Sequence, residues 1–162
     1  MHPGNTLTAL VLLMVANGSP VLAAKFLGRR FSYPIDANLR LADGARLLGA
    51  SKTVRGVAVA VLATVAAAVL LGLDWRLGLV AGSTAMAGDL LSSFIKRRLG
   101  MTASSMALGL DQIPESLFPL LACSSWLALG IVDILFGVLL FSVGALALSR
   151  LLFLLRLRQQ PY

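Results

Sequence analysis

The stretch that decides the fold is residues 77–98, which read LGLVAGSTAMAGDLLSSFIKRR. It begins as an apolar run of the length that a membrane-spanning helix needs, carries a carboxylate at Asp89 and ends in three consecutive basic residues. A carboxylate in the centre of a membrane helix costs about 2.5–3.5 kcal/mol on insertion scales, so it usually faces a bundle interior or a wet cavity. This stretch therefore predicts a membrane helix with one polar face.

The composition of the whole chain points the same way. Of its 162 residues, 58% are hydrophobic and 13% are charged, and the mean hydropathy is +0.88. Soluble domains carry about 25% charged residues, so the composition argues against a soluble domain and against a disordered chain. The length suits a single domain. The one cysteine, Cys123, excludes an intrachain disulfide and a cysteine metal cluster, and its apolar surroundings predict a packing role.

Four further apolar runs predict an all-α integral membrane protein with five transmembrane helices in one membrane domain, residues 1–162. The first run contains Asn17-Gly18-Ser19-Pro20, which predicts a kink or a break. Gly78 and Gly82 have the spacing of close helix packing, which also permits a homo-oligomer. The expected spans are residues 6–26, 54–73, 77–95, 114–131 and 134–155, with long loops at 27–53 and 96–113.

The basic residues predict how the chain is oriented in the membrane. Five spans place both long loops and the C-terminus on one face, and that face holds all of the 14 Lys and Arg residues except Arg76. The positive-inside rule makes this face cytoplasmic and leaves the N-terminus outside. We therefore expect a multi-pass protein of the cell (plasma) membrane. Its net charge of +7 then suits the lipid bilayer's anionic face and phosphate-bearing ligands, with no nucleic-acid partner.

The carboxylate of the 77–95 span has polar neighbours at helical spacing. Asp89, Ser92, Ser93 and Lys96 follow i, i+3, i+4 and i+7 and therefore share one face. Asp89 is either a structural partner of a nearby basic residue or a cavity carboxylate that holds a metal or a polar ligand. Lys96 on this face suits a phosphate, whereas the two following arginines, Arg97 included, also fit a stop-transfer cluster.

A second polar group, Ser51-Lys52-Thr53-Val54-Arg55-Gly56, opens the 54–73 span. Free backbone N–H groups at a helix start, together with Lys52 and Arg55, make an anion site. The alternative is a capping Ser51 or Thr53 with positive-inside charges. A P-loop is excluded, because Ala50 rather than lysine follows Gly49.

Two further groups complete the candidates. Asp111 and Glu115 flank Pro114 at the start of the 114–131 span. They either favour the positive end of that helix or supply oxygen ligands to Mg²⁺, which prefers one or two carboxylates plus substrate phosphates. Asn17 and Ser19 lie at the interruption of the first span, where irregular backbone is tolerated only beside protein or a water-filled cavity.

The order and spacing of these motifs resemble the CDP-archaeol synthase family over about residues 10 to 120. The resemblance implies a five-helix membrane enzyme, related to phosphatidate cytidylyltransferases, that transfers CMP from CTP to a lipid phosphate with Mg²⁺ and releases pyrophosphate. In that family the lipid is an unsaturated diether glycerol phosphate. The motifs are Asn17-Gly18-Ser19-Pro20, Pro34-Ile35-Asp36, Asp43-Gly44, Gly49 to Gly56, Gly88-Asp89, Ser93 to Arg98 and Gly109-Leu110-Asp111-Gln112.

The resemblance also assigns roles by residue. It makes Asp89, Asp111, Lys96 and Lys52 catalytic, and Asp89, Asp111 and Glu115 the metal ligands. One position departs from the family pattern, since Pro114 stands where a second Asp is expected. Glu115 or Asp89 would then supply the missing oxygen. The residues expected to bind nucleotide and phosphate are Asn17, Ser19, Ser51, Lys52, Thr53, Arg55, Ser93, Lys96 and Arg97.

Two other functions stay open at this point. A homologue without the second acidic position could bind lipid or nucleotide without turnover. A small transporter or channel could use Asp89 and the interrupted first span to line a path. Within the enzyme hypothesis, diether and diacyl glycerol phosphates present the same head to these residues.

Overall fold

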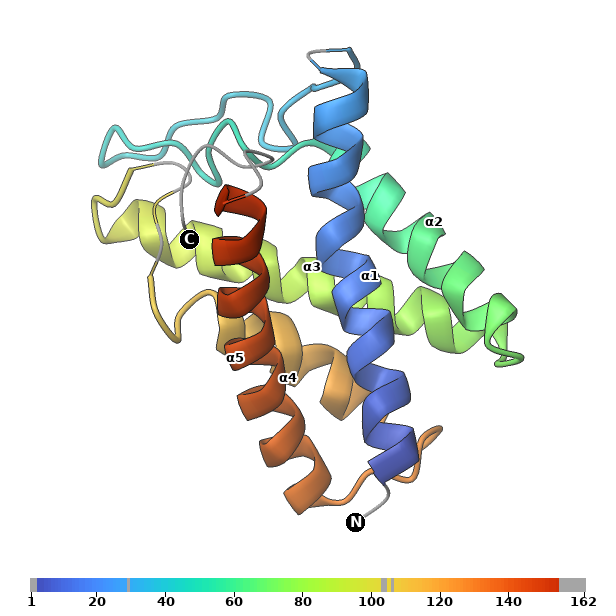
Figure 1. Ribbon diagram of the computed structural model, residues 1–162. Helices are drawn as coiled ribbons and strands as arrows, with labels where there is room; N and C mark the ends of the chain where they lie inside the picture. The colour runs from blue at the N-terminus through green and yellow to red at the C-terminus, as the bar shows by residue number, and fades with distance from the viewer. Residues whose placement is uncertain (1–2, 29, 103–104, 106, 155–162) are drawn as a thin grey trace.

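The computed structural model describes residues 3–28, 30–102, 105 and 107–154, and within these it contains five helices and no strand. The all-helical fold class is confirmed. By length and composition, α1, α3 and residues 131–150 of α5 are able to cross a membrane. Residue 155, the predicted end of the last span, and Arg29, Arg156 and Arg158 lie outside the described residues. The helices are α1 (Pro3–Leu27), α2 (Val54–Leu70), α3 (Trp75–Arg98), α4 (Gln112–Ala122) and α5 (Ile131–Leu154) (Figure 1).

A kink or a break was expected in the first span. The break is wrong, because α1 continues without interruption through Pro20, and the kink stays a prediction. Proline lacks an N–H group, so it removes one helical hydrogen bond, but the other bonds of a 25-residue helix remain. Gly56 of α2 stands opposite, and a Cβ atom placed there would lie 3.7 Å from the Cβ of Pro20.

Helices α2 and α3 form a tightly packed hairpin. Thr53 caps α2 by accepting a hydrogen bond from the N–H of Gly56, so the capping interpretation of Thr53 is confirmed. Helix α2 ends at Leu70, three residues before the prediction, because the chain turns at Gly72 with a φ of +73°. Asp74 then caps α3, which begins at Trp75 rather than residue 77.

The glycine pair of α3 serves this hairpin. A Cβ atom at Gly78 would lie 2.7 Å from the backbone of Thr64 and Val65, and one at Gly82 would lie 3.0 Å from the Cα of Val61. The pair therefore packs against α2 of the same chain, as small residues do between membrane helices. A homo-oligomer stays a prediction that needs a different contact surface.

The fourth predicted span, residues 114–131, is much shorter than expected. Helix α4 covers Gln112–Ala122, or 11 residues, and at 1.5 Å per residue it is about 16 Å long. The hydrocarbon core of a bilayer is about 30 Å thick, so α4 does not cross it as one helix. Residues 123–128 form turns instead, with Leu129 N–H donating to the Ser124 carbonyl and Ala128 at a φ of +47°.

The C-terminal ends of α1, α3 and α5 lie on the same side of the molecule as loop 28–53. In Figure 1 the C-terminal ends of α1 and α5 point the same way, and loop 28–53 lies at that end. An ion pair of 2.6 Å between Arg98 and Asp43 holds the end of α3 to this loop. The apolar core contains residues of all five helices and of residues 123–129. It includes Leu12 and Leu13 of α1, Ala68 of α2, Leu77 and Ala81 of α3, Leu120 of α4, and Ile134 and Phe141 of α5.

Among the described glycines, Gly88 has the tightest surroundings, at the point where α3 crosses the start of α4. A Cβ atom at Gly88 would lie 2.2 Å from the carbonyl oxygen of Pro114 and 2.8 Å from the backbone nitrogen of Glu115. No side chain other than hydrogen fits against a neighbouring backbone at that distance. Because Asp89 directly follows Gly88, this contact determines how close Asp89 comes to α4.

We expect Gly88→Ala to destabilise the protein strongly. Overpacking of a well-packed site costs about 1–3 kcal/mol and occasionally more, and a backbone clash with Pro114 places this substitution at the upper end. The measurement is the thermal unfolding midpoint in detergent. Gly144→Ala is the matched control, since nothing lies within 4 Å of its Cβ position and alanine favours a helix. Equal midpoints for the two variants would contradict the packing assignment.

Candidate active site

A cavity of about 820 Å³ opens between the C-terminal halves of α1, α3 and α5 and the starts of α2 and α4. The lining contains charged and apolar side chains, so a ligand inside the cavity meets charged groups and hydrocarbon together. Most of the polar lining comes from residues 51–53, α3 and residues 105–115, namely Ser51, Lys52, Thr53, Asp89, Ser93, Lys96, Arg97, Ser105, Asp111, Gln112 and Glu115. Most of the apolar lining, called the apolar wall below, comes from α1 and α5, which also contribute Asn17, Lys25 and Ser149; its residues include Met14, Val21, Leu22, Phe26, Phe141, Ala145, Leu146 and Leu148.

Most of the residues predicted from the sequence line this cavity. Ser19 and Arg55 do not line it. Arg55 instead donates to the backbone carbonyls of Gly28 and Arg30, which ties the start of α2 to the end of α1. The roles of all these residues stay predictions. The predicted residues that line the cavity are Asn17, Ser51, Lys52, Thr53, Asp89, Ser93, Lys96, Arg97, Asp111 and Glu115.

Asp89 is held by Lys52, which comes from a segment 37 positions earlier in the chain. The Nζ atom of Lys52 lies 2.6 Å from each of the two carboxylate oxygens of Asp89. Both side chains are partly accessible, at 21% for Lys52 and 26% for Asp89. This ion pair joins the entrance of α2 to the middle of α3 and leaves both groups within reach of a ligand.

Asp111 is held by Lys96, and its second oxygen has a separate partner. The Nζ atom of Lys96 lies 2.7 Å from Oδ1 of Asp111 and donates to the carbonyl of Ser105 at 3.0 Å. Oδ2 of Asp111 accepts a hydrogen bond from the N–H of Ala107 at 3.0 Å. The lysine and the carboxylate are therefore both anchored to the backbone of the loop between α3 and α4.

Glu115 lies on the first turn of α4 and lines the same cavity. It is within electrostatic reach of both ion pairs, since Asp89, Lys52, Asp111 and Lys96 all act on it. None of the four ion pairs found in the described part of the chain involves Glu115. Glu115, one residue after Pro114, is thus the acidic side chain that α4 brings to the cavity.

The neighbours of Asp89 on α3 differ in what they do. Ser93 lines the cavity, whereas Ser92 is fully buried and donates to the carbonyl of Gly88 at 2.7 Å. Asn17 of α1 also lines the cavity, and neither atom of its side-chain amide has a hydrogen-bond partner among the residues that the structure describes. An unpaired buried amide is costly, so Asn17 is a position where a polar ligand would recover the loss. The hydroxyl of Ser19 is likewise buried and unpaired.

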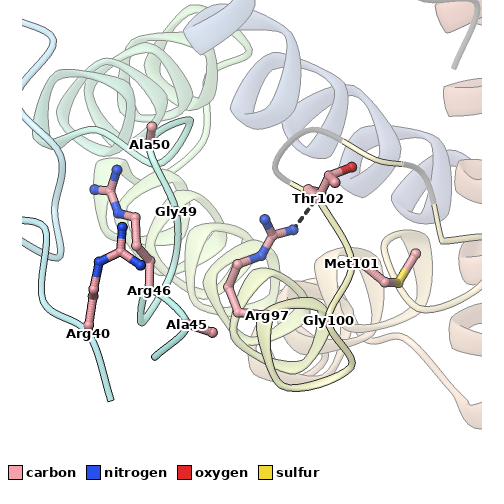
Figure 2. A pocket seen from close by; sticks show the side chains of 9 residues that line it. All are labelled: Arg40, Ala45, Arg46, Gly49, Ala50, Arg97, Gly100, Met101 and Thr102. Atoms are coloured by element: carbon pink, nitrogen blue, oxygen red, sulfur yellow. Dashed lines mark hydrogen bonds between the residues drawn. The ribbon is translucent and has the colours of Figure 1, made fainter. Parts of the chain in front are cut away.

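Arg97 lines a second, smaller cavity as well, which has a volume of about 360 Å³. The Arg97 side chain donates to the carbonyl of Thr102 at 2.7 Å, and the residue is only 9% exposed. Figure 2 shows Arg40 and Arg46 together on loop 28–53, across from Arg97. Arg97 therefore lines both cavities.

Loop 28–53 is organised around Asp36, a residue to which the sequence analysis gave no role. The side chain of Asp36 is fully buried and accepts hydrogen bonds from Arg46 and from the N–H groups of Leu48 and Gly49. Burial alone would raise the pKa of this carboxyl, but the bonds from Arg46, Gly49, Leu48 and Asn38 outweigh it and hold the pKa well below its usual range. The Pro34-Ile35-Asp36 motif carried this signal in the sequence.

Other cavity residues gave no separate signal in the sequence. Lys25 was one positive-inside charge among several, and Gln112 adjoined a predicted carboxylate. The apolar residues of α5 could not be told from those of any other membrane helix. Only the packing of α5 beside α1 shows that Phe141, Ala145 and Leu148 line the cavity.

The donor set of this site suits a hard cation, although no ready-made cage is present. Within the described residues, no group of three or more His, Cys, Asp and Glu side chains stands together to hold a metal ion. Asp89 and Asp111 nevertheless offer carboxylate oxygens to the same cavity. Mg²⁺ is usually bound by one or two carboxylates plus substrate phosphates and water, so the residues present fit that ion when it arrives with a phosphate ligand.

The fold and the cavity define a class of protein: a helical membrane protein whose polar cavity, next to an apolar wall, suits a phosphate-bearing ligand. Comparison with known proteins narrows this class. A family profile described as CarS-like, CDP-archaeol synthase, matches residues 73–162. A CDP-archaeol synthase of Pyrobaculum calidifontis is 37% identical over 98% of this chain and 99% of its own length. One of Sulfurisphaera tokodaii is 34% identical over 92% of this chain and 90% of its own.

A solved structure agrees with these relatives. It is described as an intramembrane enzyme for archaeal membrane lipids biosynthesis, and it superimposes on this chain with a TM-score of 0.69. The two are 29% identical, and the match covers 88% of this chain and 91% of the other. The chain belongs to the CDP-archaeol synthase family, and the resemblance inferred from its motifs is confirmed.

We expect Asp36→Asn to lower the free energy of unfolding by about 2 kcal/mol at pH 7, because it weakens hydrogen bonds to a charged group. The pKa of Asp36 is lower in the folded protein than its unfolded value of about 3.9. Its contribution is therefore present above that unfolded value and is lost as the pH falls through the folded one. Thermal unfolding of both proteins in detergent from pH 7 to pH 3 measures this. The gap between them should shrink as the pH falls, and a constant gap would contradict the assignment.

Proposed function

We propose that this protein is a CTP-dependent cytidylyltransferase that transfers CMP from CTP to a phosphate-bearing lipid of the membrane. Membership of the CDP-archaeol synthase family supports this activity. The observation that carries it here is the meeting of two lysine–carboxylate pairs, Lys52–Asp89 and Lys96–Asp111, in one cavity with an apolar wall. A phosphate and a lipid chain need those two environments side by side.

For this reaction the protein has to position the two substrates and neutralise the charge that develops on the phosphates. An oxygen of the lipid phosphate attacks the α-phosphorus of CTP, and a new P–O bond forms. The bond between the α-phosphorus and the β-phosphate oxygen breaks, and pyrophosphate leaves. Lys52, Lys96 and Arg97, which line the cavity, hold the phosphates and offset the charge that develops on the leaving group. Holding the two substrates in line removes much of the entropic barrier.

The proposal assigns the metal to the carboxylates of the cavity. Asp89 and Asp111 would hold Mg²⁺, and Glu115 would assist from α4, one residue after the position where the resemblance predicts a second Asp and this chain has Pro114. When bound, Mg²⁺ supplies Lewis-acid neutralisation of the CTP phosphates. Ser51, Thr53, Ser93 and the unpaired amide of Asn17 contact the nucleotide. Ser19 and Arg55 lie outside the cavity lining and take no direct part in this arrangement.

The lipid reaches the site from the side. The apolar wall consists of residues from α1 and α5, which are also the most apolar long helices of the chain. A lipid whose chains lie along this wall places its phosphate at Lys52 and Lys96 without leaving the bilayer. The name of the relatives points to a diether lipid, and we adopt a diether glycerol phosphate as the expected substrate.

The orientation proposed for the protein follows from charge. Loop 28–53, the end of α3 and the end of α5 meet at one side of the molecule (Figure 1), and the basic residues of the chain concentrate in these segments. We place this side, and with it the open end of the cavity, at the cytoplasmic face of the plasma membrane. The N-terminus of α1 then lies at the outer face.

The first test is pyrophosphate release by the purified protein in detergent. CTP and Mg²⁺ are supplied with a diether glycerol phosphate in one arm and a diacyl glycerol phosphate in the other. We expect release with the diether lipid, and a loss of at least about a hundredfold in Asp89→Asn, the scale on which losing one charge-stabilising group is felt. Asp43→Asn is the matched control, because Asp43 pairs with Arg98 outside the cavity.

Two results of this test would contradict parts of the proposal. Full activity of Asp89→Asn would contradict the assignment of the site. CTP binding without release from either lipid would instead identify a binding protein without turnover, in which Pro114 stands where the resemblance predicts an Asp.

A further inference from the structure

Each carboxylate proposed for the metal is already bound by a lysine proposed for the phosphates. Lys52 holds Asp89 and Lys96 holds Asp111. The site therefore neutralises its own charges before any ligand arrives. A cation that enters alone has to displace an ammonium group, and a nucleotide that enters alone has to displace a carboxylate.

The two pairs are not equivalent. Lys52 lies 2.6 Å from both oxygens of Asp89, and no other hydrogen bond to that carboxylate is found among the described residues. Asp111 forms an ion pair with Lys96 through one oxygen and accepts a hydrogen bond from the N–H of Ala107 through the other. Lys96 also donates a hydrogen bond to the carbonyl of Ser105. Removing Lys52 from its partner thus frees the whole Asp89 carboxylate, whereas Lys96 and Asp111 keep backbone partners when they separate.

We propose that Lys52 is a resident counter-ion that makes the binding of the divalent cation and of CTP mutually dependent. The inference rests on the proposed function and adds an ion-pair exchange to it. When cation and nucleotide enter together, Asp89 moves from Lys52 to the cation and Lys52 moves from Asp89 to a phosphate oxygen. No charge is left unpaired, so the complex binds where neither component binds well alone. Lys52 is in this respect a coupling residue.

This exchange predicts effects of opposite sign from one substitution. Without the ammonium group, Asp89 is an unpaired carboxylate that attracts a bare cation, while the nucleotide loses a phosphate contact. We expect Lys52→Gln to bind the bare cation about tenfold more tightly than the wild type, which is within the usual range of coupling between two ligands. The same variant should bind CTP more weakly than the wild type does. Adding CTP should also raise its affinity for the cation by a smaller factor than it does in the wild type.

The experiment uses Mn²⁺ as a paramagnetic probe in place of Mg²⁺, with the full chain in detergent. Free Mn²⁺ is measured by electron paramagnetic resonance in titrations with and without CTP, so no turnover is needed. Lys52→Arg keeps the charge and should keep the low affinity for bare Mn²⁺. Lys25→Gln is the matched control, because Lys25 lines the same cavity but belongs to none of the ion pairs in the described part of the chain. It should leave the affinity for bare Mn²⁺ nearly unchanged.

A second variant tests the other half of the exchange and does not depend on Lys52→Gln being folded. Asp89→Asn releases Lys52 from its partner, so we expect it to bind CTP in the presence of EDTA about tenfold more tightly than the wild type does. Isothermal titration calorimetry gives this affinity directly. A structural role for the ion pair alone would lower the unfolding midpoint of both variants without raising either affinity.

The outcomes separate this inference from the function on which it rests. If the wild type binds CTP with Mn²⁺ and releases pyrophosphate, but Lys52→Gln fails to gain affinity for bare Mn²⁺ and Asp89→Asn fails to gain affinity for bare CTP, the exchange is overturned and the enzyme stands. If the wild type binds no CTP under any condition, both the proposed function and the exchange are overturned.

Discussion

The site depends on the closeness of α3 and α4 at Gly88. Because a hydrogen atom is all that fits between this residue and the carbonyl of Pro114, the backbones of the two helices meet there. The contact brings Asp89, on one helix, into the same cavity as Asp111 and Glu115 at the start of the other. In a membrane, helices associate through close packing rather than through the exclusion of water, so small residues control which polar groups meet.

Once brought together, the charges of the cavity are kept in an apolar protein by pairing. Lys52 and Lys96 each neutralise a carboxylate, and Lys96 and Asp111 also bind the backbone of the loop between α3 and α4. A partly buried carboxylate without a partner would be costly. The pairs therefore stabilise the ligand-free protein and at the same time keep in reserve the groups that a metal–nucleotide complex needs. The same side chains thus stabilise the ligand-free protein when they pair with one another and serve the proposed function when they bind the ligand instead.

Loop 28–53 depends on one buried carboxylate in the same way. Asp36 collects hydrogen bonds from a guanidinium and from successive backbone N–H groups, so a segment without helix or sheet still has a defined course. The loop ends at Lys52 and Thr53, which enter the cavity as α2 begins. The position of Lys52 is thus determined from outside the membrane helices, and Arg98, bound to Asp43, ties the loop to the end of α3.

The sequence by itself determined the helical membrane class, the positions of α1, α2, α3 and α5 to within a few residues, and most of the polar side chains that line the cavity. It could do so because long apolar runs, capping residues and charges within apolar segments are local signals. It failed at α4, where an apolar composition does not say whether residues 123–130 continue a helix or turn. It also predicted a possible break at Pro20 that the structure does not have, because a proline removes one helical hydrogen bond but does not say whether the rest of the helix holds.

Only the tertiary structure decided which charges pair, that Arg55 binds loop carbonyls rather than the cavity, and that α5 supplies the apolar wall. Lys52 and Asp89 are 37 positions apart, and their meeting depends on the glycine contacts that set the distances between α2, α3 and α4. The sequence shows which chemical groups the chain carries. The distances between those groups depend on how the helices pack, and a binding site forms only where packing brings the groups close together.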